Sequence, residues 1–479
     1  MRILSSVDDL AETCDVAIIG GGPGGLAAAT TAAESGLSVV LIDENDALGG
    51  QIYRGISTVP ASRLEILGAD YAKGRALVDA FAAAGADYMP GTTVWMASPE
   101  LKLGISREGA ARIVAARRII IATGALERPM PIPGWTLPGV MTAGAAQGLL
   151  KASGMVPEAP FVLAGTGPLL WLLASQLLSA GARPTAILET SSRKQLLAAA
   201  TDLPAFLTSP YLAKGLGLMR QVAASIRVIS GVTALAAEGE TWLSRLRFRR
   251  GTRAWETLPA QGLFLHQGVV PNINLARAAG CSLQWDSSQA CFVPVADEWG
   301  RSSLEGVALA GDGAGIMGAE IAAARGHLCG LDAAHLLGVM TVEERQRRAE
   351  PWQQTIRRYG RGRRFLDTAF KAPDEFRVAE GETIVCRCES VTASQIKTAL
   401  GPLGDAGPNQ LKTMLRCGMG PCQGRLCGLT VTEMIARERQ VSPQDVGYYR
   451  LRPPVKPITL GELASLPHDT ADVLAVVRE

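Results

Sequence analysis

Five of the nine cysteines fall in one short stretch near the end of the chain, where their spacing suits metal chemistry. Cys386 and Cys388 form a C-x-C pair, and Cys422 and Cys427 form a later C-x4-C pair. Two such pairs provide four thiolates, enough for a [2Fe–2S] cluster or for zinc. Cys417 is a further thiol close by, and pairing it with Cys422 produces the same C-x4-C spacing. The sequence therefore predicts a metal centre and leaves open both its metal and its second ligand pair.

A glycine-rich turn near the start of the chain has the pattern of a dinucleotide site. Gly20, Gly22 and Gly25 fill a G-x-G-x-x-G motif between an apolar stretch at 15–19 and an Ala-rich stretch at 26–35. These stretches predict a buried strand and a helix. The first glycine permits the tight turn, the second admits a pyrophosphate, and the third lets helix and strand pack closely. The helix N-terminus then offers unpaired N–H groups to the phosphates.

An acidic residue stands where this motif requires one. Asp43 follows a predicted strand at 38–42, about 20 residues after Gly20, where a carboxylate can bind the adenosine ribose. Glu44 is the alternative ribose partner, although Asp43 better fits the end of the strand.

Three later segments resemble FAD-contacting turns of flavoproteins that have two dinucleotide-binding domains. They are Gly-Gly-Gln at 49–51, Ile-Ile-Ile-Ala-Thr-Gly at 119–124 and Val-Ala-Leu-Ala-Gly-Asp at 307–312. The resemblance implies that Asp312 hydrogen-bonds the ribityl chain or the pyrophosphate, and that the helix after it points its N-terminus at the flavin. Because these segments and the first motif occur in the order of that class, FAD is the predicted cofactor. The candidate contacts from the three segments are Gly50, Gln51, Thr123, Gly124, Gly311 and Asp312.

A second strand–turn–helix unit begins at residue 161 and is incomplete as a nucleotide fingerprint. Leu170 occupies the place of the third glycine, where a bulky side chain would separate helix and strand or crowd a pyrophosphate. Glu189 ends the next predicted strand, at 186–189, and a carboxylate there favours NAD over NADP. A working NAD site, a site for another adenine nucleotide and a retained structural domain all remain open.

Composition narrows the class of protein. Hydrophobic residues make up 47% and charged residues 19% of the 479 residues, which suits a well-packed protein of two or three domains. A net charge of +2 provides no electrostatic basis for binding nucleic acid or an acidic membrane. The uncharged stretch at 161–182 has glycines and a proline near its start, so it is predicted as strand, turn and helix and not as a transmembrane segment. Nine cysteines without a visible export signal predict a reducing, cytoplasmic location.

The remaining reactive side chains are assigned mostly to structure. His266 follows an apolar run, and a core or loop histidine is favoured over one beside the flavin. Segments 49–60 and 150–260 contain no cysteine, so the reactive pair of disulfide reductases is missing from both. No catalytic residue is assigned, because the predicted chemistry is redox chemistry supplied by cofactors. Four isolated cysteines are predicted to be buried structural thiols: Cys14, Cys281, Cys291 and Cys329.

The cysteine motifs also resemble a known domain. Cys-x-Cys-Glu-x-Val-Thr from residue 386, followed by Gly-Met-Gly-Pro-Cys-Gln-Gly-x-x-Cys from residue 418, is similar to the bacterioferritin-associated-ferredoxin-like [2Fe–2S] domain. Such a domain follows the FAD module in A subunits of octopine and nopaline oxidases. It also occurs in flavin subunits of hydrogen cyanide synthase and in related proline and hydroxyproline dehydrogenases. Segments 49–54 and 265–272 extend the resemblance over nearly the whole chain.

The resemblance implies a set of cofactors and ligands. The cluster ligands carried over by motif are Cys386, Cys388, Cys422 and Cys427, with Cys417 as a surplus thiol and zinc as the alternative metal. FAD and the [2Fe–2S] cluster are implied as cofactors. The resemblance is also compatible with FMN at a subunit interface.

The same resemblance implies the A subunit of a hetero-oligomeric amine or amino-acid dehydrogenase. A flavoprotein B subunit would oxidise the C–N bond of an amine or opine substrate, and a small third subunit is compatible with the family. Electrons would pass to an acceptor such as the respiratory chain, which allows peripheral association with a membrane. The alternatives are a stand-alone NAD(P)H-dependent reductase and a non-catalytic scaffold.

These interpretations predict an α/β fold built as a two-dinucleotide-binding-domain flavoprotein with a small C-terminal [2Fe–2S] domain. A Rossmann-like FAD domain is expected at 1–150 and 262–335, with a Rossmann-like domain inserted at 151–261. A linker at 336–377, the [2Fe–2S] domain at 378–450 and a tail at 451–479 complete the expected division.

Overall fold

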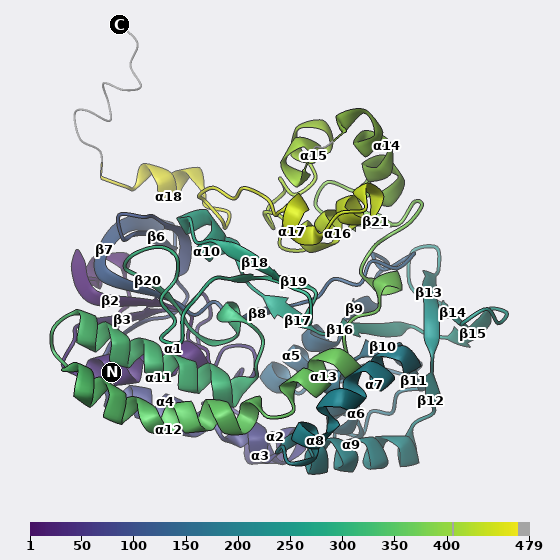
Figure 1. Cartoon of the computed structure of the whole chain (residues 1–479), viewed down its shortest axis with the longest axis horizontal. Coiled ribbons are helices and arrows are strands. Elements are labelled where there is room, and N and C mark those ends of the chain that lie inside the picture. Colours follow the sequence, from purple (N-terminus) through teal and green to yellow (C-terminus); the bar gives the residue numbers. More distant parts are fainter. Residues whose placement is uncertain (405–406, 468–479) are drawn as a thin grey trace, which may run out of the picture.

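The computed structural model describes residues 1–404 and 407–467, and these residues form an α/β protein with three parts (Figure 1). A unit built on a large sheet and a unit built on a smaller parallel sheet lie side by side, and a small, mainly helical part sits above them. Residues 468–479 of the expected tail lie outside the described residues.

The first unit contains an eight-stranded sheet in the order β1-β4-β3-β2-β7-β6-β5, with β20 paired to β7. The strands around β2, β3 and β20 run parallel, whereas β5, β6 and the first half of β7 form an antiparallel ribbon. The strands are β1 (Arg2–Ile3), β2 (Thr13–Ile19), β3 (Val39–Ile42), β4 (Asp87–Met89), β5 (Thr93–Ala97), β6 (Lys102–Arg107), β7 (Ala110–Ile121) and β20 (Val307–Leu309).

Close backbone approach holds the helices to this sheet. α1 (Pro23–Glu34) follows β2 directly, and a Cβ on Gly25 would lie 1.8 Å from the Gly20 carbonyl oxygen. α11 (Ala319–Leu336) crosses α1 with similar closeness, because a Cβ on Gly326 would lie 2.1 Å from the Gly24 carbonyl oxygen. Glycines at these points therefore allow helix, strand and second helix to pack without intervening side chains.

The second unit is a five-stranded, wholly parallel sheet in the order β12-β11-β10-β16-β9. β9 and β16, which the sequence-based division assigns to the FAD-binding domain, pair within this sheet. Helices α5 (Ala143–Ser153), α6 (Pro168–Ser179) and α9 (Tyr211–Ser225) accompany it. The strands are β9 (Val140–Thr142), β10 (Phe161–Thr166), β11 (Ala186–Glu189), β12 (Val228–Ser230) and β16 (Gly262–Gln267).

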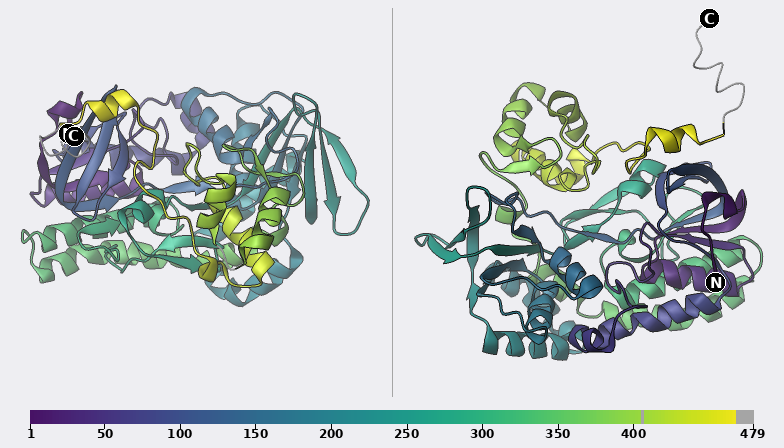
Figure 2. Two further views of the ribbon diagram at one scale, coloured as in Figure 1. Left: turned by 90° about the horizontal axis from the view of Figure 1, so that it is seen from above. Right: turned by 180° about the vertical axis from the view of Figure 1, so that it is seen from behind.

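Shorter elements connect and flank the two sheets. An antiparallel sheet of β13 (Val232–Glu238), β14 (Arg245–Arg250) and β15 (Glu256–Pro259) stands at the outer edge of the second unit (Figure 2). Two antiparallel pairs join the units: β8 (Ala125–Glu127) with β17 (Val269–Pro271), and β18 (Leu283–Asp286) with β19 (Cys291–Pro294). The flanking helices are α2 (Ala61–Leu67), α3 (Ala69–Ala72), α4 (Gly74–Ala83), α7 (Arg193–Ala199), α8 (Leu203–Leu207), α10 (Asn274–Ala279), α12 (Val342–Gly360) and α13 (Arg363–Ala369).

The C-terminal part is packed against the rest of the protein. Its side chains share one hydrophobic core with β17 and β19, and the ring centroids of Phe292 and Tyr448 lie 5.6 Å apart in an edge-on contact. Its elements are β21 (Ile384–Cys386), β22 (Val391–Thr392), α14 (Ala393–Leu403), α15 (Pro408–Leu415), α16 (Gly428–Arg439) and α17 (Pro443–Val446). α18 (Leu460–Ala464) follows and lies beside the large sheet (Figure 1). Among the described residues, no helix is both long and apolar enough to span a membrane.

The glycine contact between α1 and β2 leads to a stability prediction. Gly25→Ala should lower the free energy of unfolding by roughly 1–3 kcal/mol or more, because the new methyl group meets backbone that cannot move aside. Gly215→Ala in α9 is the matched control, since its Cβ would enter open space and should stabilise the helix by about 0.5–1 kcal/mol. Thermal unfolding of both full-length variants checks this. Equal melting temperatures would contradict the proposed close approach.

Candidate functional site

A cavity of about 840 Å³ lies where the glycine turns of the first unit converge. The turns follow β2, β3, β7 and β20, so they meet at the carboxyl edge of the parallel strands. Gly25 is the one predicted residue outside the cavity wall, because it lies behind the turn against Gly20. The predicted residues that line it are Gly20, Gly22, Asp43, Glu44, Gly50, Gln51, Thr123, Gly124, Gly311 and Asp312.

Bare backbone forms the middle of the cavity. Gly22 caps the N-terminus of α1, and a Cβ on Gly50 would lie 2.8 Å from the Gly22 Cα. Two turns from different parts of the chain thus meet without side chains between them. Unpaired N–H groups and the positive end of the helix dipole face this point, which fits a pyrophosphate.

Asp43 organises the first glycine turn. It is 4% exposed, and its carboxylate accepts hydrogen bonds from the Gly21 N–H and from the backbone and side-chain amides of Asn45. Burial raises the pKa of Asp43, while these donors oppose the rise. Glu44, the alternative ribose partner, forms an ion pair with Lys456. Hydrogen bonds from Gly21 and Asn45 therefore fix the orientation of the Asp43 carboxylate at the cavity wall. Ribose binding by Asp43 stays a prediction.

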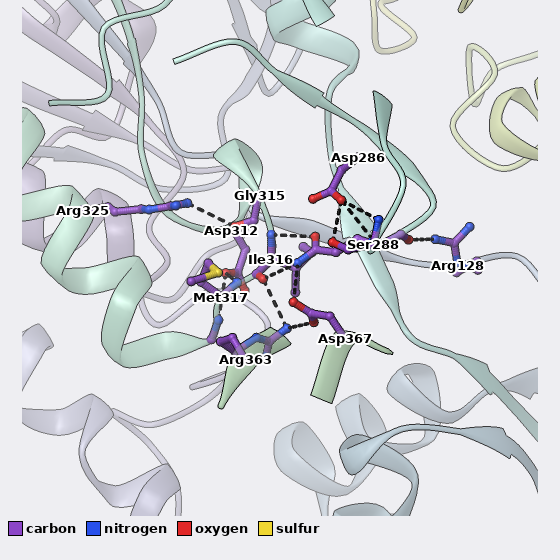
Figure 3. A network of polar contacts seen from close by, with 12 residues as sticks. Arg128, Asp286, Ser288, Asp312, Gly315, Ile316, Met317, Arg325, Arg363 and Asp367 are labelled. Atoms are coloured by element: carbon purple, nitrogen blue, oxygen red, sulfur yellow. Dashed lines mark hydrogen bonds and ion pairs between the residues drawn. The ribbon is translucent and has the colours of Figure 1, made fainter. Parts of the chain in front are cut away.

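The loop after β20 is held by a second carboxylate. Asp312 Oδ1 accepts from the Met317 N–H at 2.9 Å and from the Gly318 N–H at 3.2 Å, immediately before α11 begins (Figure 3). Arg325 on α11 donates to the Gly315 carbonyl at 3.3 Å. The carboxylate thus shapes the turn in front of the helix and still lines the cavity.

The linker helix α13 supports the same loop. Arg363 pairs with Asp367 at 2.6 Å and donates to the Ile316 carbonyl at 3.3 Å (Figure 3). Gln289 adds a hydrogen bond from its amide to that carbonyl at 2.8 Å. A segment that the sequence indicated only as linker therefore fixes a cavity loop.

α5 forms the far wall of the cavity. Gly144, Ala145 and Gly148 line it, and the Gly144 N–H donates to Glu127 Oε2 at 2.7 Å. Glu127 Oε1 lies 2.6 Å from Nδ1 of His266, which is 2% exposed. His266 is therefore the buried, hydrogen-bonded histidine that the sequence favoured, although its partner Glu127 lines the cavity.

The second glycine turn packs closely against the neighbouring strand β16. A Cβ on Gly165 would lie 1.7 Å from the His266 carbonyl oxygen, and Leu170 is fully buried in the core of its unit. The Glu189 carboxylate accepts from the Ser191 N–H at 2.9 Å, and burial raises its pKa. The bulk at position 170 is accommodated by packing, and nucleotide binding at this turn remains open.

Three of the C-terminal thiols gather in the core. The Sγ atoms of Cys386, Cys417 and Cys427 all lie within 4.8 Å of one another, and all three side chains are buried. Hydrogen bonds from the thiols of Cys417 and Cys427 lower the pKa of Cys386 to about 2. This grouping favours a thiolate and therefore a soft metal ion.

The other two thiols lie at the surface side of the same loops. Cys388 is exposed and adjoins the partly buried Cys422, with which it hydrogen-bonds. A Cβ on Gly420 would lie 2.2 Å from the Cys388 Cβ, so this loop closes tightly around the thiol. The five thiols thus form two neighbouring groups, one of Cys386, Cys417 and Cys427 and one of Cys388 and Cys422, and these donors fit a thiolate-held metal group.

The thiol loop also reaches the first cavity. Arg425, between Cys422 and Cys427, lines the cavity together with Asn274. The Asn274 side-chain amide donates to the Gln423 carbonyl at 2.9 Å. One loop therefore serves both the thiol cluster and the wall of the cavity.

A buried ion cluster joins the C-terminal part to the first unit. Glu433 on α16 lies 3.6 Å from Arg128 and forms a closer pair with Arg377. Arg128 also donates to the carbonyls of Gln289 and Ala290, at 2.6 and 3.0 Å. The Arg128 and Glu433 side chains are 4% and 6% exposed, so these charges are shielded from water.

Sequence reasoning missed this ion cluster and the loop supports from α13. Their members are scattered in sequence and match no motif. The available signal was a charged residue in an otherwise apolar or small-residue segment, as for Glu433 in α16 and for Lys151 in α5. Such a residue needs a partner or a function.

Comparisons with known proteins agree with this geometry. Residues 14–326 match the family described as pyridine nucleotide-disulphide oxidoreductase, and residues 380–466 match the sarcosine oxidase A3 domain. The A subunit of opine oxidase from Rhizobium meliloti is 46% identical, over 99% of this chain and 92% of that protein. Hydrogen cyanide synthase subunit HcnB of Pseudomonas protegens is 31% identical, over 92% of this chain and 95% of that protein. L-proline dehydrogenase from P. horikoshii shares the fold, with a TM-score of 0.71 at 20% identity, covering 96% of this chain and 80% of that one.

The cavity, the paired sheets and these matches define a flavin-dependent oxidoreductase of the pyridine nucleotide-disulphide oxidoreductase class. Within that class the chain belongs to the family of opine oxidase A subunits. The predicted fold class and family resemblance are thereby confirmed, including a distinct C-terminal domain with clustered cysteines.

The position of Asp43 predicts its effect on flavin binding. Asp43→Ala should weaken flavin binding by roughly 1.5–3 kcal/mol, through loss of a charge-assisted hydrogen bond and of the support for the Gly21 turn. Glu44→Ala is the matched control, and flavin release under dilution is the measurement. Full retention in Asp43→Ala together with release in Glu44→Ala would reassign the ribose contact to Glu44.

Proposed function

We propose that this chain is the FAD- and [2Fe–2S]-containing A subunit of a hetero-oligomeric amine or amino-acid dehydrogenase, most like opine oxidase. A flavoprotein B subunit oxidises the C–N bond of the substrate, and this chain passes the electrons toward an acceptor such as the respiratory chain. The protein acts in the cytoplasm, with membrane contact through that acceptor.

One observation supports the proposal above the others. The loop between Cys422 and Cys427 also lines the dinucleotide cavity through Arg425, so the two candidate redox sites share a wall. The ion cluster around Glu433 keeps the parts that contain them in one arrangement. Electron transfer between two redox sites requires that they lie close together, and a shared wall meets that requirement.

FAD is the proposed occupant of the cavity. The bare glycine backbone suits its pyrophosphate, and Asp43 would contact the adenosine ribose. The Asp312 carboxylate also lines the cavity, where it would contact the ribityl chain or the pyrophosphate. Bound FAD would supply two-electron chemistry and the cluster one-electron transfer, which is the physical reason for having both. The chain's own residues orient the cofactor and shield it from water.

The proposed cluster ligands are Cys386, Cys388, Cys422 and Cys427. The buried neighbours Cys386 and Cys427 would hold one iron, and the outer neighbours Cys388 and Cys422 the other. Cys417, the third thiol of the buried group, would be the surplus one, as the motif resemblance implies. This assignment takes two of the three buried thiols together with the neighbouring pair of Cys388 and Cys422.

Other nucleotides have separate roles in the proposal. FMN would lie at the interface with the B subunit. The second glycine turn serves as a structural element, because Leu170 is built into the core there. Reduction of the isolated chain's flavin by NADH would contradict that role and favour a stand-alone reductase.

Co-purification with the partner subunits tests the whole proposal. The complex should oxidise one class among opines, glycine and proline derivatives, with flavin reduction preceding reduction of the cluster in stopped-flow spectra. Turnover by this chain in isolation, at the rate of the complex, would contradict the assignment of substrate oxidation to the B subunit.

The metal centre predicts a distinct composition. The purified chain should contain two irons per molecule and show a reducible cluster signal, because four thiolates in two close pairs match that cluster. Iron and zinc analysis with electron paramagnetic resonance is the measurement. Stoichiometric zinc without iron would contradict the cluster.

Paired cysteine variants test the ligand assignment. Cys427→Ser should abolish the native cluster spectrum, whereas Cys417→Ser should retain it with a changed potential, since groups outside the ligand set tune a metal centre without removing it. Iron content and resonance spectra of both variants are compared. A cluster that survives in Cys427→Ser and disappears in Cys417→Ser would make Cys417 and Cys422 the second pair.

A further inference from the structure

α5 contains a buried cation that the proposed function does not yet use. Lys151 is 5% exposed and lines the cavity. Its ammonium donates to Gln147 Oε1 at 2.9 Å and to the Gln51 carbonyl at 3.2 Å. Both acceptors are neutral, and both residues belong to the same cavity wall.

Lys151 has no counter-ion in the part of the chain that the structure describes. Within residues 1–404 and 407–467, no carboxylate lies within ion-pair distance of its ammonium, and two of its three donors have partners. Burial, with a smaller contribution from the charge of Arg54, lowers its pKa to about 7. Burying an unpaired cation destabilises the fold, so such a group points to a function.

Lys151 belongs to the α5 wall of the cavity, whereas the predicted adenosine contacts belong to the turn after β3. One end is made by neighbours of Asp43, because Thr92 donates to its carbonyl and Lys456 pairs with the adjacent Glu44. The other end is made by α5 with Glu127 and Gln51. With its pyrophosphate at the N-terminus of α1 and its adenosine at the turn after β3, an extended FAD would have its ring system toward α5.

The helix face beside Lys151 suits a flat ring. Gly144, Gly148 and Lys151 stand at positions i, i+4 and i+7 of α5, which share one face of a helix, and all three line the cavity. A Cβ on Gly148 would meet nothing within 4 Å, so a planar group can approach the helix closely there, and the ammonium stands one turn further along. The space in front of Gly144 is taken by the Glu127 carboxylate. The nearby Glu127 carboxylate is already engaged by His266 and the Gly144 N–H.

We infer that Lys151 stabilises the negative charge that the flavin ring gains on reduction. The inference rests on the proposed function, since it requires FAD in this cavity. Two electrons accompanied by one proton leave the ring with one negative charge, and the Lys151 ammonium lies in a partly desolvated wall where that charge is felt strongly. Lys151 thereby raises the reduction potential and improves this protein as an acceptor for electrons from its partner.

Sulfite affinity of the flavin-loaded, full-length chain tests this without turnover. Sulfite adds through its sulfur lone pair to the flavin N5 and leaves the same single negative charge on the ring, so its dissociation constant reports the electrostatics directly. Lys151→Met should bind sulfite about tenfold more weakly (about 1.4 kcal/mol) and show a lower midpoint potential. Lys151→Arg keeps the charge and should remain close to the wild type.

Lys102→Met is the matched control, because it removes one exposed cation from β6, outside the cavity. Its bound flavin should keep the wild-type sulfite affinity. If Lys151→Met does not retain flavin, Lys151→Gln compared with Lys151→Arg provides the same contrast of charge. Equal sulfite affinity in the charged and neutral variants would overturn the inference alone. A wild-type chain that binds no flavin on reconstitution would overturn the proposed function and the inference with it.

Discussion

The arrangement of this protein depends on a carboxylate buried between two arginines. Glu433 comes from the C-terminal domain, Arg128 from the segment directly after β8, and Arg377 from the linker. Removing one member of such a buried cluster typically costs about 3–5 kcal/mol, because the remaining charges lose their partners. The cluster therefore acts with the shared hydrophobic core to keep the thiol loops against the flavin cavity.

The cavity is largely preformed by the protein itself. Asp43 and Asp312 each accept hydrogen bonds from backbone N–H groups of a glycine-containing turn, so the turns keep their shape through local donors. Hydrogen bonds to a carboxylate are stronger than those between neutral groups, which suits them to hold a turn in shape. Supports from α13 and α11 then fix the loop after β20 from outside (Figure 3).

Much of the local structure followed from sequence patterns. The strand–turn–helix units at 13–34 and 161–179 were predictable because buried strands are short apolar runs and glycine marks the turn between strand and helix. The pairing of β9 and β16 into the second sheet was not predictable. Both strands adjoin chain segments that belong to the first cavity, and strand partners are chosen by contacts distant in sequence.

The sequence by itself determined the residue types and spacings that local backbone geometry converts into function: the glycine turns, the acid at the end of β3 and the five cysteines. Only the tertiary structure decided which of these meet. It grouped Cys386 with Cys417 and Cys427, brought Arg425 to the flavin cavity and left Lys151 without a counter-ion among the described residues. The physical reason is the separation along the chain of the residues that decide each feature. A turn or a helix cap is decided within a few residues, whereas the surroundings of a buried charge or thiol depend on packing between segments hundreds of residues apart.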